Sequence, residues 1–194
     1  MKVAFGLKAH SGWAALVVVG VSDSGHALVD RRRLELVEER SGKAPYHAAE
    51  ELEPGPARDL VERSVKAAHR CALKEMRVAV KRERERRNEV VACAVLMGSP
   101  MPEWTTEEIR AVHFRMHKAE GMLFKTALAR AAEACDLKLL EVPEKTLVKQ
   151  AGPLAKTIAA LGKNAGPPWG KDQKEAALAA LVALRNLRSG RAPR

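Results

Sequence analysis

Three apolar, strand-like segments follow one another within the first 38 residues, and this order constrains the fold more than any other feature. They cover residues 2–7, 13–21 and 27–38, and the middle one is apolar throughout and rich in β-branched residues, as expected of a buried strand. Turns are predicted at Lys8-Ala9-His10-Ser11-Gly12 and Ser22-Asp23-Ser24-Gly25. Strands joined by such short turns predict a three-stranded meander.

Helices and strands alternate in the rest of the chain. Strands are predicted at 89–97 and 138–142, and helices at about 57–87, 105–135, 147–162 and 172–187, with a polar loop at 40–56. This order predicts an α/β protein with a mixed five-stranded sheet, made of the meander and two further strands, and helices on both faces. We expect one domain over residues 1–188 and a basic, disordered tail at 189–194.

The chain is strongly basic. Its 194 residues include 34 Lys and Arg against 24 Asp and Glu, and the net charge of +10 favours a polyanionic partner such as nucleic acid. Aromatic residues make up only 4%, so bases stacked on an aromatic platform are not the expected binding mode. Three cysteines without a CxxC pair argue against a disulfide framework or a structural zinc site and suit a cytoplasmic location. We expect neither a signal peptide nor a membrane span.

Two carboxylates, Asp172 and Glu175, stand three residues apart at the start of the alanine- and leucine-rich last helix. This spacing places them on one helix face, about one turn apart. Such a pair can hold a divalent cation, which metal-dependent phosphodiester chemistry needs. The alternative is that Asp172 is an N-cap or first-turn acid, favoured by the helix dipole, and that Glu175 completes a capping pattern.

Histidines supply two further candidate sites. His10 follows the first predicted strand, where the ends of central strands line the cleft of α/β folds, so it is a candidate metal ligand or general base. The alternative is a solvent-exposed turn histidine. His113, His117 and Glu120 have i, i+4, i+7 spacing on one helix face, which can bind zinc or another transition metal. The HExxH arrangement is absent, however, and surface histidines without a metal are far commoner.

Basic side chains in the C-terminal third are candidate phosphate contacts. They are Lys145, Lys149, Lys156, Lys163, Lys171, Lys174, Arg188 and Arg191. A second basic patch is expected on the third strand, at Arg31, Arg32 and Arg33. Phosphate contacts would give affinity without sequence specificity. The alternative is that these scattered cations are simply solvated.

The C-terminal half resembles a RuvC-type Holliday-junction resolvase of the RNase H-like superfamily. The matching segments are 118–121 (Lys-Ala-Glu-Gly), 139–143, 148–150, Lys156 and 172–179, with a looser match at 5–13. The resemblance implies an RNase H-like fold, branched DNA as the partner, and a homodimer that matches the symmetry of the junction. It also implies Mg²⁺ or Mn²⁺ held by four carboxylates, one ending the first strand, one ending the fourth strand and two on the last helix.

Only half of these carboxylates are present. The two on the last helix map onto Asp172 and Glu175, the first maps onto Lys8, and the second falls at 93–96, where there is no acid. An ammonium group in place of a bridging carboxylate repels divalent cations. The resemblance therefore implies a degenerate acidic site, in which Lys8 pairs with Asp172 or Glu175 or contacts a phosphate.

Three functions follow as alternatives. The first is a protein that binds branched or structured DNA, with nuclease activity lost or reduced and RNA left open as a partner. Its predicted nucleic-acid contacts are Lys8, Lys149, Lys156, Lys171 and Lys174. The second is an active metal-dependent endonuclease, in which Asp172 and Glu175 act with His10 or Glu120 as substitute ligands. The third is a protein-interaction module that retains only the fold. An actin-like nucleotide-binding role ranks last, because the first turn has one glycine and no acid.

Overall fold

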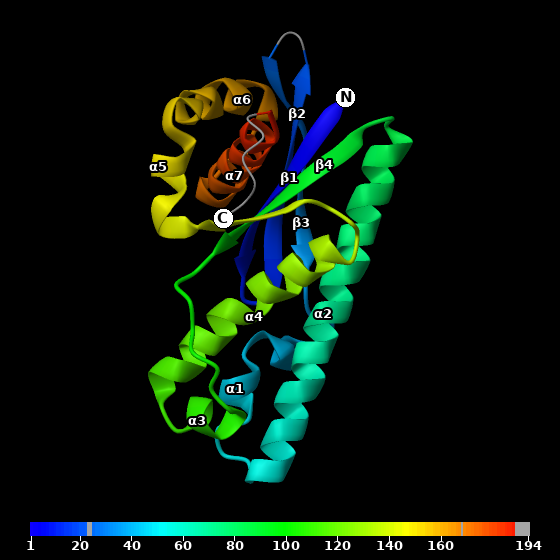
Figure 1. The fold of residues 1–194 in the computed structure, drawn as a ribbon. Helices are drawn as coiled ribbons and strands as arrows, with labels where there is room; N and C mark the ends of the chain where they lie inside the picture. The colour runs from blue at the N-terminus through cyan, green and yellow to red at the C-terminus, as the bar shows by residue number, and fades with distance from the viewer. Residues whose placement is uncertain (23–24, 168, 189–194) are drawn as a thin grey trace.

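The computed structural model describes residues 1–22, 25–167 and 169–188 and contains one five-stranded sheet (Figure 1). Its strands are β1 (Lys2–His10), β2 (Trp13–Ser22), β3 (Gly25–Glu35), β4 (Glu89–Met97) and β5 (Leu139–Pro143). The order across the sheet is β3-β2-β1-β4-β5. The first three strands form an antiparallel meander, whereas β4 and β5 run parallel to β1. The predicted mixed sheet, with the first strand at its centre beside the fourth, is confirmed.

Helices cover both faces of the sheet (Figure 1). They are α1 (Pro45–Ala48), α2 (Pro54–Glu85), α3 (Thr106–Arg110), α4 (His113–Glu133), α5 (Leu147–Ala151), α6 (Thr157–Ala165) and α7 (Lys171–Arg188). Three short 3-10 helices, η1 (Arg40–Lys43), η2 (Glu144–Thr146) and η3 (Gly152–Lys156), lie in the connections. No helix in the described part of the chain is both long enough and apolar enough to cross a membrane.

The period-two alternation of β1 divides the core into two parts. Val3, Phe5 and Leu7 are fully buried against α2 and α4, whose inward residues include Met76 and Phe124. The other face of β1 is turned toward α7, and Ala4 is buried there with the alanine-rich face of that helix. Because successive side chains of a strand point to opposite faces, Lys8 and His10 also lie on the α7 side. The side chains of Lys8 and His10 therefore point from β1 toward the first turn of α7.

A close contact between β1 and α7 depends on a residue without a side chain. A Cβ atom added at Gly6 would lie 1.8 Å from the backbone oxygen of Ala176. The small residues of α7, including Ala176, Ala179 and Ala180, are fully buried in the same core. Helix α7 therefore packs directly against β1. This contact fixes the distance between the first turn of α7 and the end of β1.

One predicted turn and one predicted strand end differ in the structure. Strand β1 continues through Lys8 and His10, which pair with Ala15 and Trp13, so the predicted turn shortens to Ser11 and Gly12. Gly12 has a φ of 84°, a conformation that glycine adopts without steric cost. The third strand ends at Glu35 instead of residue 38. The longer β1 matters for function, because it places Lys8 inside the sheet and not in a solvent-exposed turn.

The helix predicted over residues 105–135 is two helices. Thr105 begins α3 with a capping box shared with Glu108, as its sequence predicts. The chain then leaves the helical conformation at Val112, whose φ and ψ are −139° and 112°. No glycine or proline marks this break. The predicted loop 40–56 contains the short helix α1. The helix predicted over residues 147–162 is divided into α5, η3 and α6. The predicted tail 189–194 lies outside the described residues.

Candidate functional site

The ammonium group of Lys8 lies between two carboxylates from different elements. Its Nζ atom is 2.6 Å from Glu144 Oε2, in η2 directly after β5, and 2.9 Å from Glu175 Oε2, in α7. The Lys8 side chain is only 12% exposed, so these ion pairs are partly shielded from water. A second ammonium, from Lys125 of α4, contacts Glu144 Oε1 at 2.6 Å. We refer to Lys8, Lys125, Glu144 and Glu175 as the Lys8 cluster.

The Lys8 cluster stabilises its own charges. Burial lowers the pKa of Lys8, but hydrogen bonds and charges from Glu144 and Glu175 outweigh it, and the pKa is raised overall. Burial raises the pKa of Glu144, but hydrogen bonds and charges from Lys125 and Lys8 reverse the effect, and the pKa is lowered overall. Both shifts favour the charged forms at neutral pH. Lys8 and Glu144 therefore form an ion pair near neutral pH.

Asp172, the other acid of the last helix, meets His10. Asp172 Oδ1 lies 3.1 Å from His10 Nε2, and both side chains are about one-third exposed. The imidazole of His10 stacks on Trp13, with ring centroids 4.4 Å apart and planes 12° from parallel. The guanidinium of Arg33 covers the indole of Trp13 at 4.0 Å. His10 is thus held on β1 by stacking and faces the acid, so the alternative of a free turn histidine is wrong.

Capping does not explain the spacing of Asp172 and Glu175. The backbone N–H of Gly170 donates to Gln173 Oε1, so the side chain that reaches back at the helix start belongs to Gln173. Asp172 does lie in the first turn of α7, where the helix dipole favours a negative charge. Glu175, however, points to Lys8. Both acids of the predicted pair therefore face the end of β1, each toward a different cationic or polar partner.

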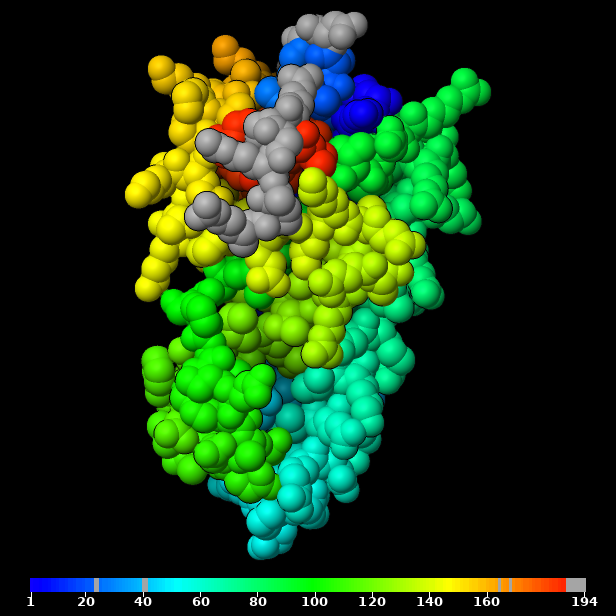
Figure 2. All heavy atoms as spheres, viewed as in Figure 1, coloured from blue at the N-terminus to red at the C-terminus, as the bar shows by residue number. Residues whose placement is uncertain are grey.

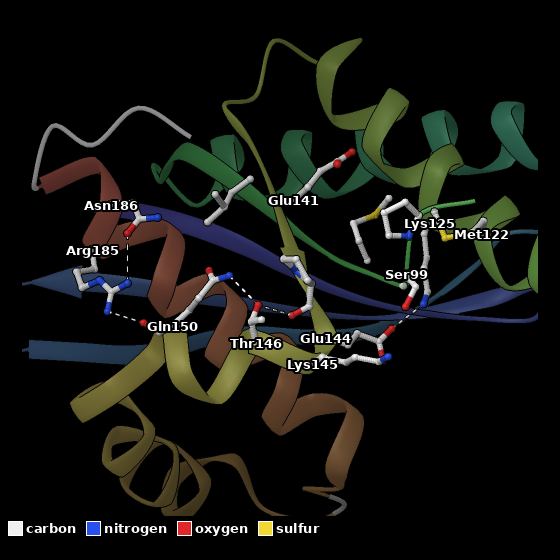
Figure 3. A pocket seen from close by; sticks show the side chains of 15 residues that line it. Ser99, Met122, Lys125, Glu141, Glu144, Lys145, Thr146, Gln150, Arg185 and Asn186 are labelled. Atoms are coloured by element: carbon white, nitrogen blue, oxygen red, sulfur yellow. Dashed lines mark hydrogen bonds and ion pairs between the residues drawn. The ribbon is translucent and has the colours of Figure 1, made fainter. Parts of the chain in front are cut away.

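A large pocket extends from Lys125 and Glu144 toward the C-terminal half of α7 (Figure 3). Its wall includes Ser99, Lys145, Gln150 and Arg185, and its volume is 1620 Å³. Pockets for small molecules are typically about 300–1,000 Å³, so this volume suits a larger ligand. Arg185 donates to the backbone oxygen of Gln150 at 2.8 Å, which holds α5 against α7.

The predicted phosphate contacts differ in their surroundings. Lys149, Lys156, Lys171 and Lys174 are all exposed, as are Lys145 and Lys163. In Figure 2 the segment from η2 to α6, coloured yellow to orange, forms one edge of the molecule, and extended side chains stand out from it. Lys8 is enclosed in its ion pairs. The side chain of Arg188 and the whole of Arg191 lie outside the described residues.

The three arginines of the predicted patch on β3 have partners within the protein. Arg32 pairs with Asp30 at 3.0 Å, and Arg33 pairs with Glu35 at 2.5 Å. Arg31 donates to the backbone oxygen of Pro167 at 3.1 Å. Neighbouring acids thus compensate two of the three charges, which the run of three arginines alone did not show.

One prediction about an acid is wrong, and another acid of the site was missed. Glu120 is not available as a substitute ligand near Asp172, because its buried carboxylate contacts His47 Nδ1 at 2.7 Å and accepts the backbone N–H groups of Tyr46 and His47. Glu144 was not predicted at all. Its signal was its position directly after a short strand that ends in proline, because the carboxyl ends of parallel strands meet at one edge of the sheet.

The sheet order and the helices on both faces define an RNase H-like fold. Solved structures of RuvC share this fold. Thermus thermophilus RuvC in complex with a Holliday junction substrate superimposes with a TM-score of 0.56 and 14% identity, covering 98% of this chain and 97% of that chain. Another T. thermophilus RuvC structure has the same score and identity, covering 97% and 96%. No protein-family model and no curated protein sequence matches this chain.

Replacing Lys8 with methionine should destabilise the protein by about 2 kcal/mol, because partly buried carboxylates lose a charged hydrogen-bond donor. For a domain of this size the melting temperature should fall by about 4–8 °C. The lowered pKa of Glu144 makes the stabilisation present above pH 4.5 and lost as the pH falls through the lowered value. The raised pKa of Lys8 makes it present below pH 10.5 and lost as the pH rises through the raised value.

Thermal unfolding of wild type and variant between pH 2 and 11 checks this expectation. The difference in melting temperature should be largest at intermediate pH and should shrink toward both extremes. Lys145→Met, at the exposed residue next to Glu144, is the matched control and should melt like wild type. A difference that is the same at every pH would mean that Lys8 acts through packing and not through its charge.

Proposed function

We propose that this protein binds branched or structured DNA and that its nuclease activity is lost or reduced. In this proposal the Lys8 cluster stands where RuvC-type resolvases have a metal-dependent nuclease site. The observation that carries the proposal is the position of Lys8 Nζ, which contacts carboxylates of both η2 and α7. The resemblance to RuvC-type resolvases implies a metal-binding carboxylate at this position of β1. A lysine there places a covalently attached cation where a divalent ion would be needed.

The donor set around Lys8 does not fit Mg²⁺ or Mn²⁺. These ions prefer several oxygen ligands that converge on one point. Here Glu144 is shared between two ammonium groups, Glu175 contacts Lys8, and Asp172 contacts His10. Bringing a divalent cation among these carboxylates would require displacing Lys8 and would add charge repulsion in a partly buried site. No catalytic step through a metal is therefore assigned to this cluster.

DNA binding rests on the charge and shape of the surface beside this cluster. The net charge is +10, and Lys125, Lys145 and Arg185 line the pocket that contains Glu144. Exposed Lys149 lies on α5, next to Gln150 of the pocket wall. Lysines that neutralise phosphates release counterions, which makes binding strongly salt-dependent. A fold shared with a resolvase that is known in complex with a Holliday junction makes the four-way junction the first substrate to test.

The decisive test is binding and cleavage of a labelled four-way DNA junction, compared with a linear duplex, in EDTA, Mg²⁺ or Mn²⁺ and across a salt series. We expect the junction to bind more tightly than the duplex, without cleavage in any metal. Affinity should fall by roughly 10³-fold between 50 and 200 mM salt if about six phosphates are contacted. No binding at low salt would overturn the proposal and favour a protein-interaction module.

A double variant, Lys149→Glu with Lys156→Glu, should weaken junction binding by about tenfold or more and lower the salt slope by about two, because two phosphate contacts are lost. Fluorescence anisotropy measures both quantities. Lys74→Glu is the matched control, since this exposed lysine lies on α2, which packs on the opposite face of the sheet from α7. Equal losses in both variants would mean that only net charge matters and that the edge around α5 is not the binding surface.

An active endonuclease is the second candidate, and Glu144 favours it. This residue adds a carboxylate that meets Lys8 together with Glu175, and under this alternative it would take the place of one of the two carboxylates that are missing from the resemblance. Under this alternative, Mg²⁺ or Mn²⁺ would support junction cleavage, with His10 as a substitute ligand. Cleavage that disappears in Asp172→Asn would establish this candidate and overturn the proposal of lost activity.

A further inference from the structure

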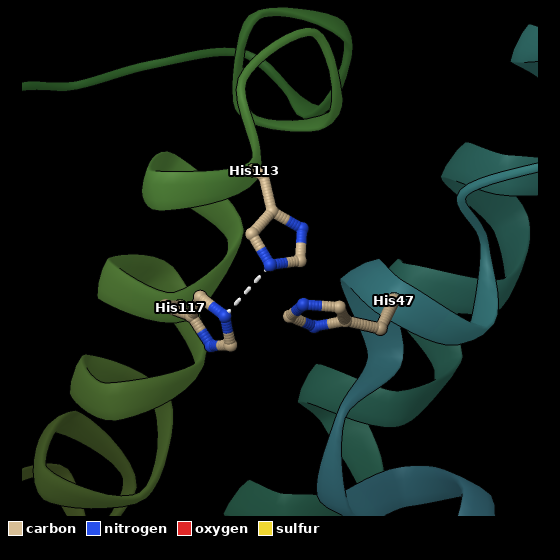
Figure 4. A group of neighbouring side chains, drawn as sticks. All are labelled: His47, His113 and His117. Carbon is tan, nitrogen blue, oxygen red and sulfur yellow. Dashed lines mark hydrogen bonds between the residues drawn. The ribbon is translucent and has the colours of Figure 1, made fainter.

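Three histidines from two separate segments converge on the side of α4. His113 and His117 lie one turn apart on α4, and their Nε2 atoms are 3.0 Å apart. His47, from α1, faces both rings, with centroids 5.1 Å from His113 and 4.6 Å from His117 (Figure 4). One ligand nitrogen of each residue lies within 4.8 Å of the other two. We call His47, His113 and His117 the histidine trio.

A buried carboxylate orients one member of the trio. Glu120 is only 8% exposed, and its Oε2 lies 2.7 Å from His47 Nδ1. Its other oxygen accepts the backbone N–H groups of Tyr46 and His47 at 3.0 and 3.1 Å, so the carboxylate is held by α1 from three directions. A carboxylate on one imidazole nitrogen fixes the ring and leaves the other nitrogen free to bind a metal. His47 Nε2 is indeed buried and makes no hydrogen bond.

The local backbone also brings the three histidines together. The chain leaves the helical conformation at Val112, so His113 is the first residue of α4. Helix α1 begins with Pro45, and its position is set by the packing of Tyr46 near Ile109 and Met116. These apolar contacts hold α1 against α3 and α4 without the histidines. The trio is therefore presented by a packed scaffold, and binding a metal there would not require the scaffold to form anew.

We propose that the histidine trio binds one Zn²⁺ ion, with Glu120 as a positioning residue behind His47. Imidazole nitrogens suit zinc better than they suit Mg²⁺ or Ca²⁺. Tetrahedral zinc with Zn–N distances of about 2.0–2.1 Å needs nitrogens about 3.3 Å apart, and the trio's spacing reaches this with small side-chain rotations. Three protein ligands leave a fourth position open to water or an anion. A bound ion would also link α1 to α4, because its ligands come from both helices.

Zinc binding is tested on full-length protein purified without a histidine tag, stripped with chelator and titrated with Zn²⁺ against a chromophoric chelator. We expect one zinc per chain in wild type. His113→Ala and His117→Ala should each weaken binding by about 100-fold, since two imidazoles hold the ion poorly. Both residues are exposed, so these variants should fold. His69→Ala, at a histidine on α2 outside the trio, is the control and should bind like wild type.

Co²⁺ substitution identifies the ligands directly. The visible d–d spectrum of the Co²⁺ form should be that of a tetrahedral nitrogen site, without a thiolate charge-transfer band from the three cysteines. Glu120→Gln should shift this spectrum and weaken Zn²⁺ binding by about 10–100-fold, whereas a merely structural role would lower the melting temperature alone. Wild type that binds no zinc, or His113→Ala and His117→Ala that bind as wild type does, would overturn the proposal. The outcome is independent of DNA binding.

Discussion

Replacing Lys8 with aspartate should convert the Lys8 cluster into a site for a divalent cation. The new carboxylate would stand near Glu144 and Glu175, which Lys8 Nζ now contacts at 2.6 and 2.9 Å. Carboxylates that share one space repel one another unless a cation lies among them. Oxygen ligands of this kind suit Mg²⁺ and Mn²⁺. We expect Lys8→Asp to bind Mn²⁺ about 100-fold more tightly than wild type, as measured by isothermal titration calorimetry.

Thermal unfolding separates a new metal site from simple damage. In EDTA the Lys8→Asp variant should melt well below wild type, and saturating Mn²⁺ should restore much of the loss, because a ligand that binds only the folded state stabilises it. Lys145→Asp makes the same charge change at an exposed neighbour of Glu144 and should gain no Mn²⁺ affinity. Both variants are best compared in a His113→Ala background, which disables the histidine trio.

Tight binding of Mn²⁺ by wild type would contradict this expectation. It would mean that Lys8 moves aside to admit the ion, and the active endonuclease would then become the favoured function. Weak binding by both proteins would mean that Asp172, Glu144 and Glu175 do not converge closely enough even without the ammonium group. The three outcomes therefore distinguish a blocked site, an open site and a site that no longer exists.

Replacing Gly6 with alanine should be the most damaging small substitution in the protein. The added Cβ would lie 1.8 Å from Ala176 O, 2.7 Å from Ala176 C and 3.0 Å from Ala180 N. All three are backbone atoms of α7, so no side-chain rotation relieves the clash. Overpacking of a core typically costs about 1–3 kcal/mol and occasionally more. We expect about 3 kcal/mol, which corresponds to a fall of about 6–12 °C in melting temperature.

The displacement of α7 should also disturb the site. Because Glu175 lies one residue before Ala176, moving the helix away from β1 should lengthen the contact with Lys8 and reduce the pH dependence of stability described for Lys8→Met. Gly121→Ala is the matched control. Gly121 lies in α4, a Cβ there meets no atom within 4 Å, and alanine is favoured over glycine in a helix by about 1 kcal/mol. Equal melting temperatures of Gly6→Ala and wild type would show that α7 is not held directly on the strand.

Regular parts of the fold followed from local patterns. The apolar run from Trp13 onward and the turn residues after it predicted a meander, and the helical period of α2 and the run before Met97 predicted an alternating second half. These signals are strong because a strand or helix that buries one face must repeat apolar residues at its own period. The place of the first strand at the centre of the sheet, beside the fourth, then followed from the order of the elements, and the structure confirms it.

Irregular parts of the fold were not visible in the sequence. The break between α3 and α4 contains no glycine or proline, and α1 is too short to show a period. Both depend on the apolar contacts of Tyr46, Ile109 and Met116, which come together only in the folded chain. As a result, His113 and His117 were predicted as one group with Glu120, whereas His47 joins them and Glu120 lies behind it.

The sequence by itself determined which chemical groups are present and which are missing. It showed an acid pair at Asp172 and Glu175, a cation at Lys8 and no acid at 93–96. Only the tertiary structure decided the partners of these groups. Glu144 reaches Lys8 from 136 positions away, and His47 reaches Glu120 from 73 positions away. Helical and strand periods set which face a side chain takes, but the partner across that face depends on the packing of distant segments.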